Sequence, residues 1–329
     1  MEPQTLSPVK ISLLRPGQQV SGIFAVKIRK VLGTYTRGHR LDLILTDSSG
    51  ASIPFTLWGG PGEEARAQLQ ALLDSITEDA VLHITGSVDE YNGEPCISAN
   101  SINAVRVLKE GEFPPDAFIQ PARRDIQQMR SELAAALDSL RNPHIKAVLS
   151  HIFTPPFTEK FVVHSAAVQH HHNRIGGLAE HTLEVVRICE ELCHIYPSLD
   201  RDLLIAGALL HDIGKTREIT LSRRIKADSH GQLVGHLAYT TLMLSGALDA
   251  CGTPEPLRSK LLHLSLSHHG RNDYGSPKEP MFPEAVALHY ADEASAWLTE
   301  MIDFISEYRG TTLEDTMYSR TLRRNIYLR

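Results

Sequence analysis

The chain has 329 residues, enough for two domains that each bury a core, and 42% of them are hydrophobic. Its formal charge of −6 at pH 7 excludes a generally basic nucleic-acid binder, so any polyanion must be bound by a local cluster of cations. The four cysteines are irregularly spaced, and the chain shows neither a secretory signal nor an apolar run that could span a bilayer, so we expect a reduced, cytoplasmic protein without membrane association.

The N-terminal third carries short β-type runs separated by turn residues, which predict an all-β domain. The predicted strands are VSGIFAVKIRKV, LDLILTD, ASIPFTLW, VLHITGSVDEY and PCISANSINAV. The turn from Asp47 to Gly50 joins two of them as a hairpin, and the stretch from Gly60 to Glu78 predicts a helix that plugs a small barrel. This outline resembles an OB-fold barrel, which we expect over residues 1–108 as a nucleic-acid-binding domain.

The rest of the chain predicts a second, all-α domain. Residues 109–121 (KEGEFPPDAFIQP) hold three prolines and a glycine without a hydrophobic period, which is typical of a linker. Over residues 122–329 apolar residues recur at helical spacing, beginning with Ile126, Met129 and Leu133. The helices that matter for the site are predicted at Leu178 to Ile195, Asp200 to Ile213, His236 to Ala250, Glu255 to His269 and Glu284 to Tyr308. The expected fold class is therefore multidomain, with an all-β barrel followed by a helical domain.

Histidines are concentrated in the helical domain, because 13 of the 17 fall between His164 and His289. One His or Asp that could bind a metal lies on, or at an end of, each of the five predicted helices. The run from Leu203 to Leu210 is apolar all round and is therefore a buried helix, which ends at His211 and Asp212. A buried His-Asp pair on its own would most simply be a hydrogen-bonded core pair, but here further candidates accompany it.

The order of these residues resembles the signature of the HD superfamily of metal-dependent phosphohydrolases. His181, His211-Asp212 and Asp292 match its H…HD…D pattern, and His236 with His268-His269 resembles the subset that binds two metals. The resemblance implies a first metal at His181, His211, Asp212 and Asp292, a second at His236, His268 and His269, and a bridging Asp212. Imidazoles and carboxylates suit Mn²⁺, Fe²⁺ or Co²⁺, so two divalent metal ions are the expected cofactors, with Mn²⁺ implied by the resemblance.

Two residues are expected to take part directly in catalysis. Asp212 would hold two cations at the separation that phosphoryl transfer needs, and water bound between them would lose its proton near neutral pH and become the nucleophile. Lys215 completes the segment HDIGK, and the resemblance implies that it reaches a substrate phosphate; the alternative is a solvated lysine at a helix end. Substrate contacts are also expected from His171 and His172, which could instead cap a helix, and from Arg271, which could equally lie in a solvated loop.

The HD signature covers nucleotidases, (p)ppGpp hydrolases and phosphodiesterases, so the other domain must narrow the substrate. An OB-fold ahead of an HD domain, with the phrase HHHNRIGGLAEHT leading into His181, resembles the YhaM family of 3′–5′ exoribonucleases over nearly the full chain. The expected function is hydrolytic 3′–5′ removal of nucleoside 5′-monophosphates from single-stranded RNA, with DNA as a second substrate. The alternatives are an HD phosphodiesterase or nucleotidase that acts on small nucleotides, and a non-catalytic binder of single strands.

A basic segment in the first domain supports a nucleic-acid partner independently. Lys27, Arg29, Lys30, Arg37 and Arg40 occur without an acidic residue between positions 27 and 40, and Tyr35 lies among them. The cations would contact backbone phosphates while Tyr35, Phe55 or Trp58 stack on bases; because Phe55 and Trp58 are odd-spaced, at most one of the two should face solvent on that side. The alternative is a solvated strand edge that prevents aggregation. A further arginine cluster near the C-terminus could bind RNA or a neighbouring subunit of a homo-oligomer.

Overall fold

The computed structural model describes residues 8–77, 79–114, 117–168, 172–310 and 312–329. The chain divides into two compact units. Unit 1 comprises Met1–Gln120 together with Leu221–Ile225, and unit 2 comprises Pro121–Thr220 and Lys226–Arg329. No helix in the described part of the chain is both long and apolar enough to cross a membrane.

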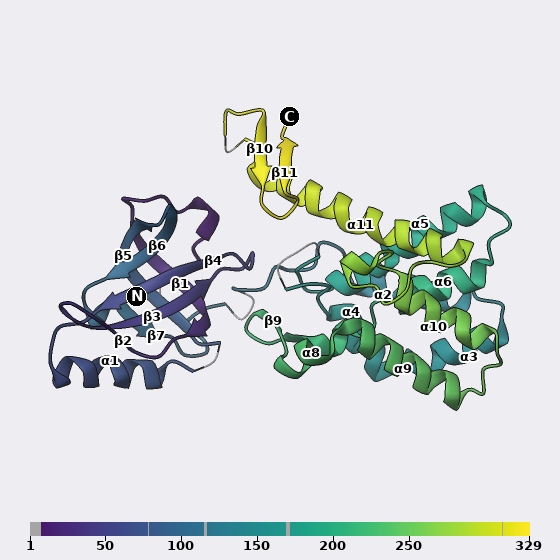
Figure 1. The fold of residues 1–329 in the computed structure, drawn as a ribbon, viewed down its shortest axis with the longest axis horizontal. Helices are drawn as coiled ribbons and strands as arrows, with labels where there is room; N and C mark the ends of the chain where they lie inside the picture. Colours follow the sequence, from purple (N-terminus) through teal and green to yellow (C-terminus); the bar gives the residue numbers. More distant parts are fainter. Residues whose placement is uncertain (1–7, 78, 115–116, 169–171, 311) are drawn as a thin grey trace. The chain divides into compact units, whose positions relative to one another are not determined.

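Unit 1 is built on one seven-stranded sheet (Figure 1). Its strands and helix are β1 (Gln19–Arg29), β2 (Gly33–Tyr35), β3 (Gly38–Thr46), β4 (Ser52–Trp58), α1 (Glu63–Ser75), β5 (Val81–Tyr91), β6 (Glu94–Ala99) and β7 (Val105–Val107). The sheet order is β1-β3-β4-β6-β5-β7, and β1 also pairs with β5. The long strand β1 therefore serves two neighbours, with Gln19–Ala25 paired to β5 and Ala25–Arg29 paired to β3.

The side chains between these strands form an apolar core that explains the strand alternation. Phe24, Leu43, Phe55 and Ile97 are almost completely buried there, while alternate residues of β3 and β4 face outward. The segment expected to be a linker contributes to a second cluster, since Phe113 and Phe118 pack with Ile23, Ala25 and Val81. Phe113 and Phe118 thus pack within unit 1, although the sequence around them shows no hydrophobic period.

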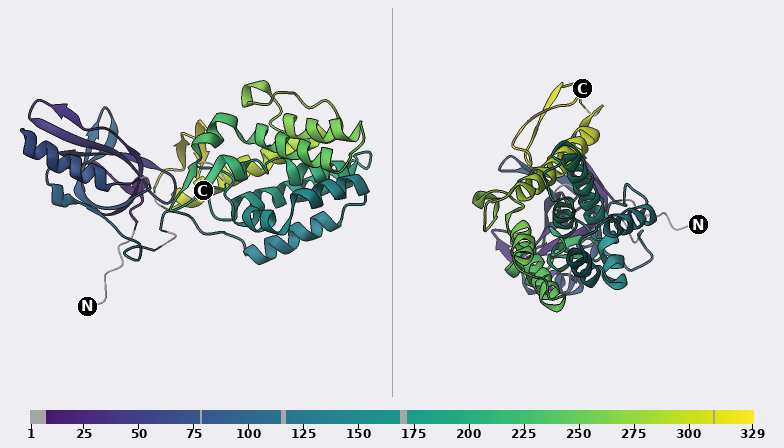
Figure 2. Two further views of the ribbon diagram at one scale, coloured as in Figure 1. Left: turned by 90° about the horizontal axis from the view of Figure 1, so that it is seen from below. Right: turned by 90° about the vertical axis from the view of Figure 1, so that its right-hand side faces the viewer.

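Unit 2 is a helical assembly whose helices lie against one another in both views of Figure 2. Its helices are α2 (Ile126–Asp138), α3 (Pro143–Ile152), α4 (Pro155–Val163), α5 (Gly177–Ile195), α6 (Arg201–Leu210), α7 (Lys215–Glu218), α8 (Ser229–Val234), α9 (His236–Ala250), α10 (Leu257–Ser267) and α11 (Pro283–Tyr308). Two short hairpins occur in the same stretch of sequence, β8 (Ile219–Leu221) with β9 (Ile225–Ala227), and β10 (Thr316–Ser319) with β11 (Arg324–Tyr327).

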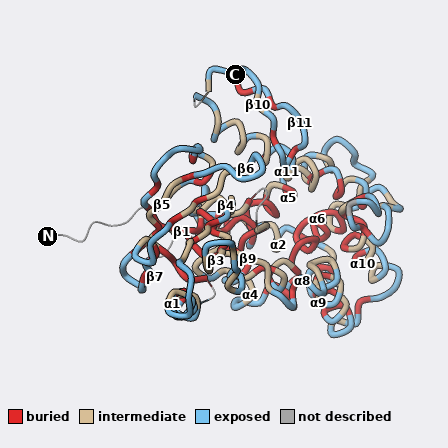
Figure 3. The backbone as a smooth tube through the Cα atoms, turned by 60° about the vertical axis from the view of Figure 1, so that its left-hand side comes forward, coloured by how far each residue is buried: buried red, intermediate tan, exposed pale blue. Residues whose placement is uncertain are grey.

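The core of unit 2 surrounds α6, which is buried from Leu203 to its last residue, Leu210 (Figure 3). Helices α5, α10 and α11 pack against α6, because an all-apolar helix must be covered on every side. Asp200 caps α6 by accepting a hydrogen bond from the backbone amide of Leu203 at 3.1 Å. This arrangement fixes the helix end from which His211 and Asp212 project.

The predicted layout of a strand-rich N-terminal part and a helical C-terminal part is confirmed. The sheet curls back so that β1 pairs with both β3 and β5, and β4 and β6 share three residue pairs, Phe55–Leu57 with Ile97–Ala99. The predicted helices begin and end within a few residues of the observed ones, and the helix expected over Gly60 to Glu78 is α1, Glu63–Ser75. The two hairpins in the region predicted to be helical were not foreseen.

Candidate metal centre

The seven predicted metal ligands come from five helix segments that meet at one place in unit 2. His181 lies on the second turn of α5, and Asp292 lies in the first half of α11. His211 and Asp212 directly follow α6, His236 is the first residue of α9, and His268 and His269 follow the last residue of α10. Helix ends therefore supply five of the seven side chains, which lets them converge without breaking a helix.

Two glycines allow these helix ends to approach closely. A Cβ on Gly214 would lie 2.2 Å from the carbonyl oxygen of His236 and 2.6 Å from the backbone nitrogen of Thr240. Gly214 instead donates its amide to Thr240 Oγ1 at 3.0 Å, which ties the turn after Asp212 to the first turns of α9. Gly270 has a φ of +78°, and a Cβ there would lie 2.3 Å from the ring of His289.

His181, His211 and Asp212 form a buried group that we call the deep triad, whose ligand atoms all lie within 4.8 Å of one another. His181 Nε2 is 3.1 Å from His211 Nε2 and 3.1 Å from Asp292 Oδ1. Asp212 Oδ2 is 3.3 Å from His211 Nε2 and 3.6 Å from His181 Nε2. The relative exposure of each of these three residues is 3% or less, so the group is shielded from solvent.

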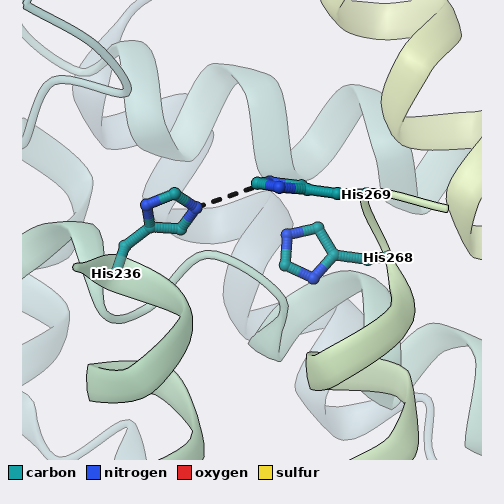
Figure 4. Close-up of side chains that lie close together, drawn as sticks. All are labelled: His236, His268 and His269. Atoms are coloured by element: carbon teal, nitrogen blue, oxygen red, sulfur yellow. Dashed lines mark hydrogen bonds between the residues drawn. The ribbon is translucent and has the colours of Figure 1, made fainter. Parts of the chain in front are cut away.

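His236, His268 and His269 form a second group, the open triad, whose ligand atoms also lie within 4.8 Å of one another. Their rings point toward a common space, with His236 Nε2 3.4 Å from His269 Nε2 (Figure 4). His236 Nε2 and His268 Nε2 each lie 3.8 Å from Asp212 Oδ1. Since the other oxygen of Asp212 faces the deep triad, this carboxylate lies between the two groups.

Hydrogen bonds fix the ring protons of the deep triad on the far side of each imidazole. His211 Nδ1 donates to the carbonyl oxygen of Ala208 at 2.8 Å. His181 Nδ1 lies 3.0 Å from Ser295 Oγ, and that hydroxyl donates its one proton to Glu184 Oε2 at 2.6 Å, so Ser295 must accept from His181. The Nε2 lone pairs of both histidines are thus left facing the carboxylates.

The open triad is oriented in the same way. His236 Nδ1 donates to Glu218 Oε2 at 2.7 Å, and His268 Nδ1 donates to the carbonyl oxygen of Ser265 at 2.9 Å. Their Nε2 atoms therefore face the common space as acceptors, where His268 Nε2 and Asp212 Oδ1 are buried and receive no hydrogen bond from the described residues. A set of lone pairs that face one another in a low-dielectric interior requires a cation or a proton between them, so the residues fit divalent metals.

The charged groups of the centre shift one another's pKa values. Burial opposes charge on Asp212, but the nearby Lys215 and His211 outweigh it and hold the pKa of Asp212 well below its usual range. Burial also opposes charge on Lys215, yet the Asp212 carboxylate, 2.6 Å from its ammonium, raises the pKa of Lys215. Burial lowers the pKa of His268 well below its usual range, which keeps that imidazole neutral and able to bind a metal.

Three supporting residues were not foreseen from the sequence: Glu184, Glu218 and Ser295. Each contacts a histidine of the centre directly or through one hydroxyl, and none has a spacing that marks it as functional on its own. A helical-wheel signal was nevertheless present, because Glu184 lies three residues after His181 and Ser295 lies three residues after Asp292.

The predicted substrate contacts of unit 2 are His171, His172 and Arg271. His172 was expected to contact substrate or to cap a helix; it is fully buried, its Nε2 lies 3.2 Å from Glu184 Oε2 and its ring centroid lies 5.3 Å from that of His181. The backbone φ of His172 is +56°. A Cβ added to Gly177 would lie 1.9 Å from the carbonyl oxygen of His172, so the loop between them is tightly folded. His171 lies outside the described residues, and Arg271 is exposed in the loop after the open triad.

The predicted cations of unit 1 differ in their surroundings. Arg29, Lys30 and Arg37 are exposed, although Arg29 also donates to the carbonyl oxygen of Ile76 at 2.7 Å. Lys27 is half-buried and donates to a serine hydroxyl at 2.9 Å; burial, followed by the nearby Arg224, lowers the pKa of Lys27. The exposed cations suit a flexible phosphate backbone, because their attraction to phosphates does not depend on one fixed geometry.

The aromatic residues of unit 1 separate as the sequence spacing predicts. Phe55 is completely buried in the sheet core, which excludes it from stacking on a base. Trp58 is half-buried on the opposite face, and its ring lies 4.8 Å from that of Tyr35 in an edge-to-face arrangement. Tyr35 also donates its hydroxyl to the carbonyl oxygen of Gly59 at 3.1 Å. Tyr35 and Trp58, with the Arg40 guanidinium 5.9 Å from the Trp58 ring, remain as a joint aromatic surface.

Comparison with known proteins adds a family relationship. The family described as HD domain matches residues 178–297, which include all seven predicted ligands. The 3'-5' exoribonuclease YhaM of Bacillus velezensis is 32% identical over 294 residues, covering 88% of this chain and 89% of that protein. The proteins of the same name from Bacillus subtilis and Bacillus pumilus are each 30% identical, over 88% and 79% of this chain and 89% and 79% of their own lengths.

Proposed function

Because the chain belongs to the YhaM family, we propose that it is a metal-dependent hydrolytic exonuclease that shortens single-stranded RNA from the 3′ end and releases nucleoside 5′-monophosphates. The observation that carries the proposal is the convergence of two triads on the two oxygens of Asp212. A pair of divalent cations held there would supply Lewis acidity, which lowers the pKa of water and neutralises charge on phosphate oxygens.

Each residue of the centre has a role that follows from its position. His181, His211 and Asp292 would bind one cation, His236, His268 and His269 the other, and Asp212 both. Helices α5, α6 and α11 exclude water from the deep triad, which strengthens every electrostatic interaction made there. Mn²⁺ is the proposed ion, since neutral imidazoles and carboxylates suit it, as they also suit Fe²⁺ and Co²⁺.

Lys215 is proposed as the group that contacts the substrate phosphate. Its ammonium lies 2.6 Å from Asp212 Oδ2, and the carboxylate raises the pKa of Lys215, so the side chain stays positively charged at neutral pH. A fixed positive charge beside the centre can stabilise the charge that develops on non-bridging phosphate oxygens during in-line attack by water. The exposed Arg271 is proposed as a further phosphate contact.

The surface of unit 1 supports a single strand as the substrate. Arg29, Lys30 and Arg37 provide exposed charge, while Tyr35 and Trp58 provide aromatic faces on which bases can stack. This combination binds single strands with little sequence preference, because phosphates and base faces recur at every nucleotide. The OB-fold interpretation of unit 1 motivates this assignment, and DNA is proposed as a second substrate.

The proposal is tested with purified protein, Mn²⁺ and single-stranded RNA labelled at its 5′ end. Wild type should give a ladder that shortens from the 3′ end together with nucleoside monophosphates, and Asp212→Asn should leave the RNA intact. Asp249→Asn is the matched control, because its side chain on α9 is 68% exposed and binds only Arg258 among the ion pairs of the described residues. This variant should give the wild-type ladder.

The same assay separates the two rival functions. Intact RNA together with cleavage of a small phosphodiester such as bis(p-nitrophenyl) phosphate would identify a small-nucleotide phosphodiesterase or nucleotidase. RNA that is bound in a mobility-shift assay but never shortened, with no cleavage of the small substrate, would identify a non-catalytic single-strand binder. A parallel reaction with single-stranded DNA of the same sequence measures the preference for ribose.

A further inference from the structure

A chain of three polar side chains runs away from the deep triad through His181. His181 Nδ1 lies 3.0 Å from Ser295 Oγ, Ser295 Oγ donates to Glu184 Oε2 at 2.6 Å, and that carboxylate oxygen lies 3.2 Å from His172 Nε2. Ser295 and His172 are buried, and Glu184 is partly buried. The rings of His211, His236 and His268 are oriented by other groups, two backbone carbonyls and Glu218.

The direction of each hydrogen bond is set by chemistry. An ionised carboxylate can only accept, so the Ser295 hydroxyl has its one proton committed to Glu184 and offers lone pairs to His181. Burial opposes the charge on Glu184, but His172 and Ser295 outweigh it and keep the pKa of Glu184 below its usual value. The charge on Glu184 therefore polarises the hydroxyl, which makes Ser295 a better acceptor for the His181 proton.

The position of this chain in the fold ties two helices together at the height of the metal centre. Glu184 and His181 are one turn apart on α5, and Ser295 and Asp292 are one turn apart on α11. The bond between Ser295 and Glu184 joins residues 111 positions apart in the sequence and lies one turn from the 3.1 Å contact between His181 and Asp292. A slip of α11 against α5 would therefore break both contacts at once.

We infer that Ser295 and Glu184 are positioning residues for the deep triad: they fix the tautomer and ring orientation of His181, so that its Nε2 faces His211 and Asp292. This inference rests on the proposed function, because it assumes that the deep triad binds a divalent cation. Outer partners of metal-binding histidines typically change metal affinity by about 10- to 100-fold when removed. The open triad, which is oriented by Glu218 and a backbone carbonyl, should be unaffected.

The test counts metals and measures their affinity in variants of the full chain. Wild type, Ser295→Ala and Glu184→Gln are loaded with Mn²⁺, passed through gel filtration and analysed by mass spectrometry for bound metal, and a Co²⁺ titration followed by absorbance gives the affinities. Wild type should retain two ions. Ser295→Ala should retain one, with about 10- to 100-fold weaker binding of the other. Glu184→Gln should show a smaller loss, because its amide oxygen still accepts from Ser295.

A matched control distinguishes the positioning of His181 by Ser295 from a general effect of the substitution on helix packing. Thr299→Ala removes a buried hydroxyl one turn beyond Ser295 on the same helix, and the described residues give this hydroxyl no contact with the centre. Thr299→Ala and Ser295→Ala should lower the melting temperature of the metal-free protein by similar amounts, yet only Ser295→Ala should lose an ion. Two tightly held ions in Ser295→Ala would overturn the inference, as would equal metal loss in both variants.

Failure of this inference is distinguishable from failure of the proposed function. If wild type binds no divalent ion under any loading condition, the proposed metal centre is wrong. The inference about Ser295 and Glu184 is then overturned as well. If wild type binds two ions and shortens RNA while Ser295→Ala behaves identically, the function stands and only the positioning role of Ser295 and Glu184 is wrong.

Discussion

The deep triad and the open triad use similar ligands in different surroundings. His181 and His211 of the deep triad have relative exposures of 0% and 1%, whereas the side chain of His236 in the open triad is 19% exposed and His269 is partly exposed. Helix α5 and the end of α6 supply the side chains of the deep triad, while those of the open triad come from the start of α9 and the end of α10. Asp212 is the residue that faces both groups.

This difference in burial indicates that the two groups have different roles. An ion in the deep triad would be shielded from water and would hold α5, α6 and α11 together, so it should bind tightly and exchange slowly. An ion in the open triad would keep contact with solvent and would be the one that an incoming phosphate could reach. Four predictions test or refine this comparison, beginning with the residue that the two groups share.

The largest effect is expected from Asp212→Asn. The amide removes the negative charge that both groups share, and its NH₂ would present hydrogens to one of them, so both ions should bind more weakly. RNA hydrolysis should fall by about 10³-fold or more, which is the scale of losing a preorganised electrostatic group. Initial rates of mononucleotide release under saturating Mn²⁺ measure this loss, and a variant that keeps more than about a tenth of wild-type activity would contradict a shared carboxylate.

Gly214→Ala should increase the distance between His236 of the open triad and Asp212. The added Cβ would lie 2.2 Å from the carbonyl oxygen of His236, although the backbone at Gly214 is an ordinary helical one. Such overpacking costs about 1–3 kcal/mol of unfolding free energy and should move His236 away from Asp212. Gly246→Ala is the control, because its added Cβ would have no described heavy atom within 4 Å other than its chain neighbours and the backbone of its own helix. Urea unfolding should show a loss for Gly214→Ala and none for Gly246→Ala.

Glu218→Gln should affect the open triad alone. The Glu218 carboxylate accepts the Nδ1 proton of His236, and its charge lowers the energy of a cation on the other side of the ring. We expect about 10- to 100-fold weaker binding of the more exchangeable ion and little change in the other. Glu191→Gln, at a side chain that is 76% exposed on α5, is the matched control. Loss of both ions in Glu218→Gln would show that the two groups bind cooperatively.

The sequence led to the seven candidate ligands through the resemblance of their order to the HD signature, and five of them lie at helix ends. The apolar run Leu203–Leu210 predicted a buried helix, and a buried helix that ends in His-Asp leaves few alternatives to a polar site. The supporting residues could not be predicted in this way. Ser295 and Glu184 are ordinary helix residues, and their partnership depends on the rotation and register of α5 against α11, which no local pattern encodes.

The sequence of unit 1 also predicted some packing contacts and missed others. The odd spacing of Phe55 and Trp58 predicted that they face different ways, and Phe55 is in the core. The packing of Phe113 and Phe118 could not be predicted, because two aromatics among prolines have no period to indicate burial. The burial of His172 could not be predicted from the sequence either, because it depends on how closely the backbone at His172 approaches Gly177 at the start of α5.

The smallest effect is expected from Arg37→Ala, which should leave both triads intact and weaken only the binding of the strand. The side chain of Arg37 is exposed on the turn between β2 and β3, so its removal should not alter folding. If it neutralises one phosphate, the slope of log affinity against log salt should fall by about 0.7, the value for single strands. The variant should raise KM at low salt and leave kcat unchanged.

Arg141→Ala removes the same charge from an exposed position in unit 2 and serves as the control. An equal change in both variants would mean that net charge, and not a strand-binding surface on unit 1, sets the salt dependence; a change confined to Arg37→Ala would separate recognition of the strand from chemistry at the two triads.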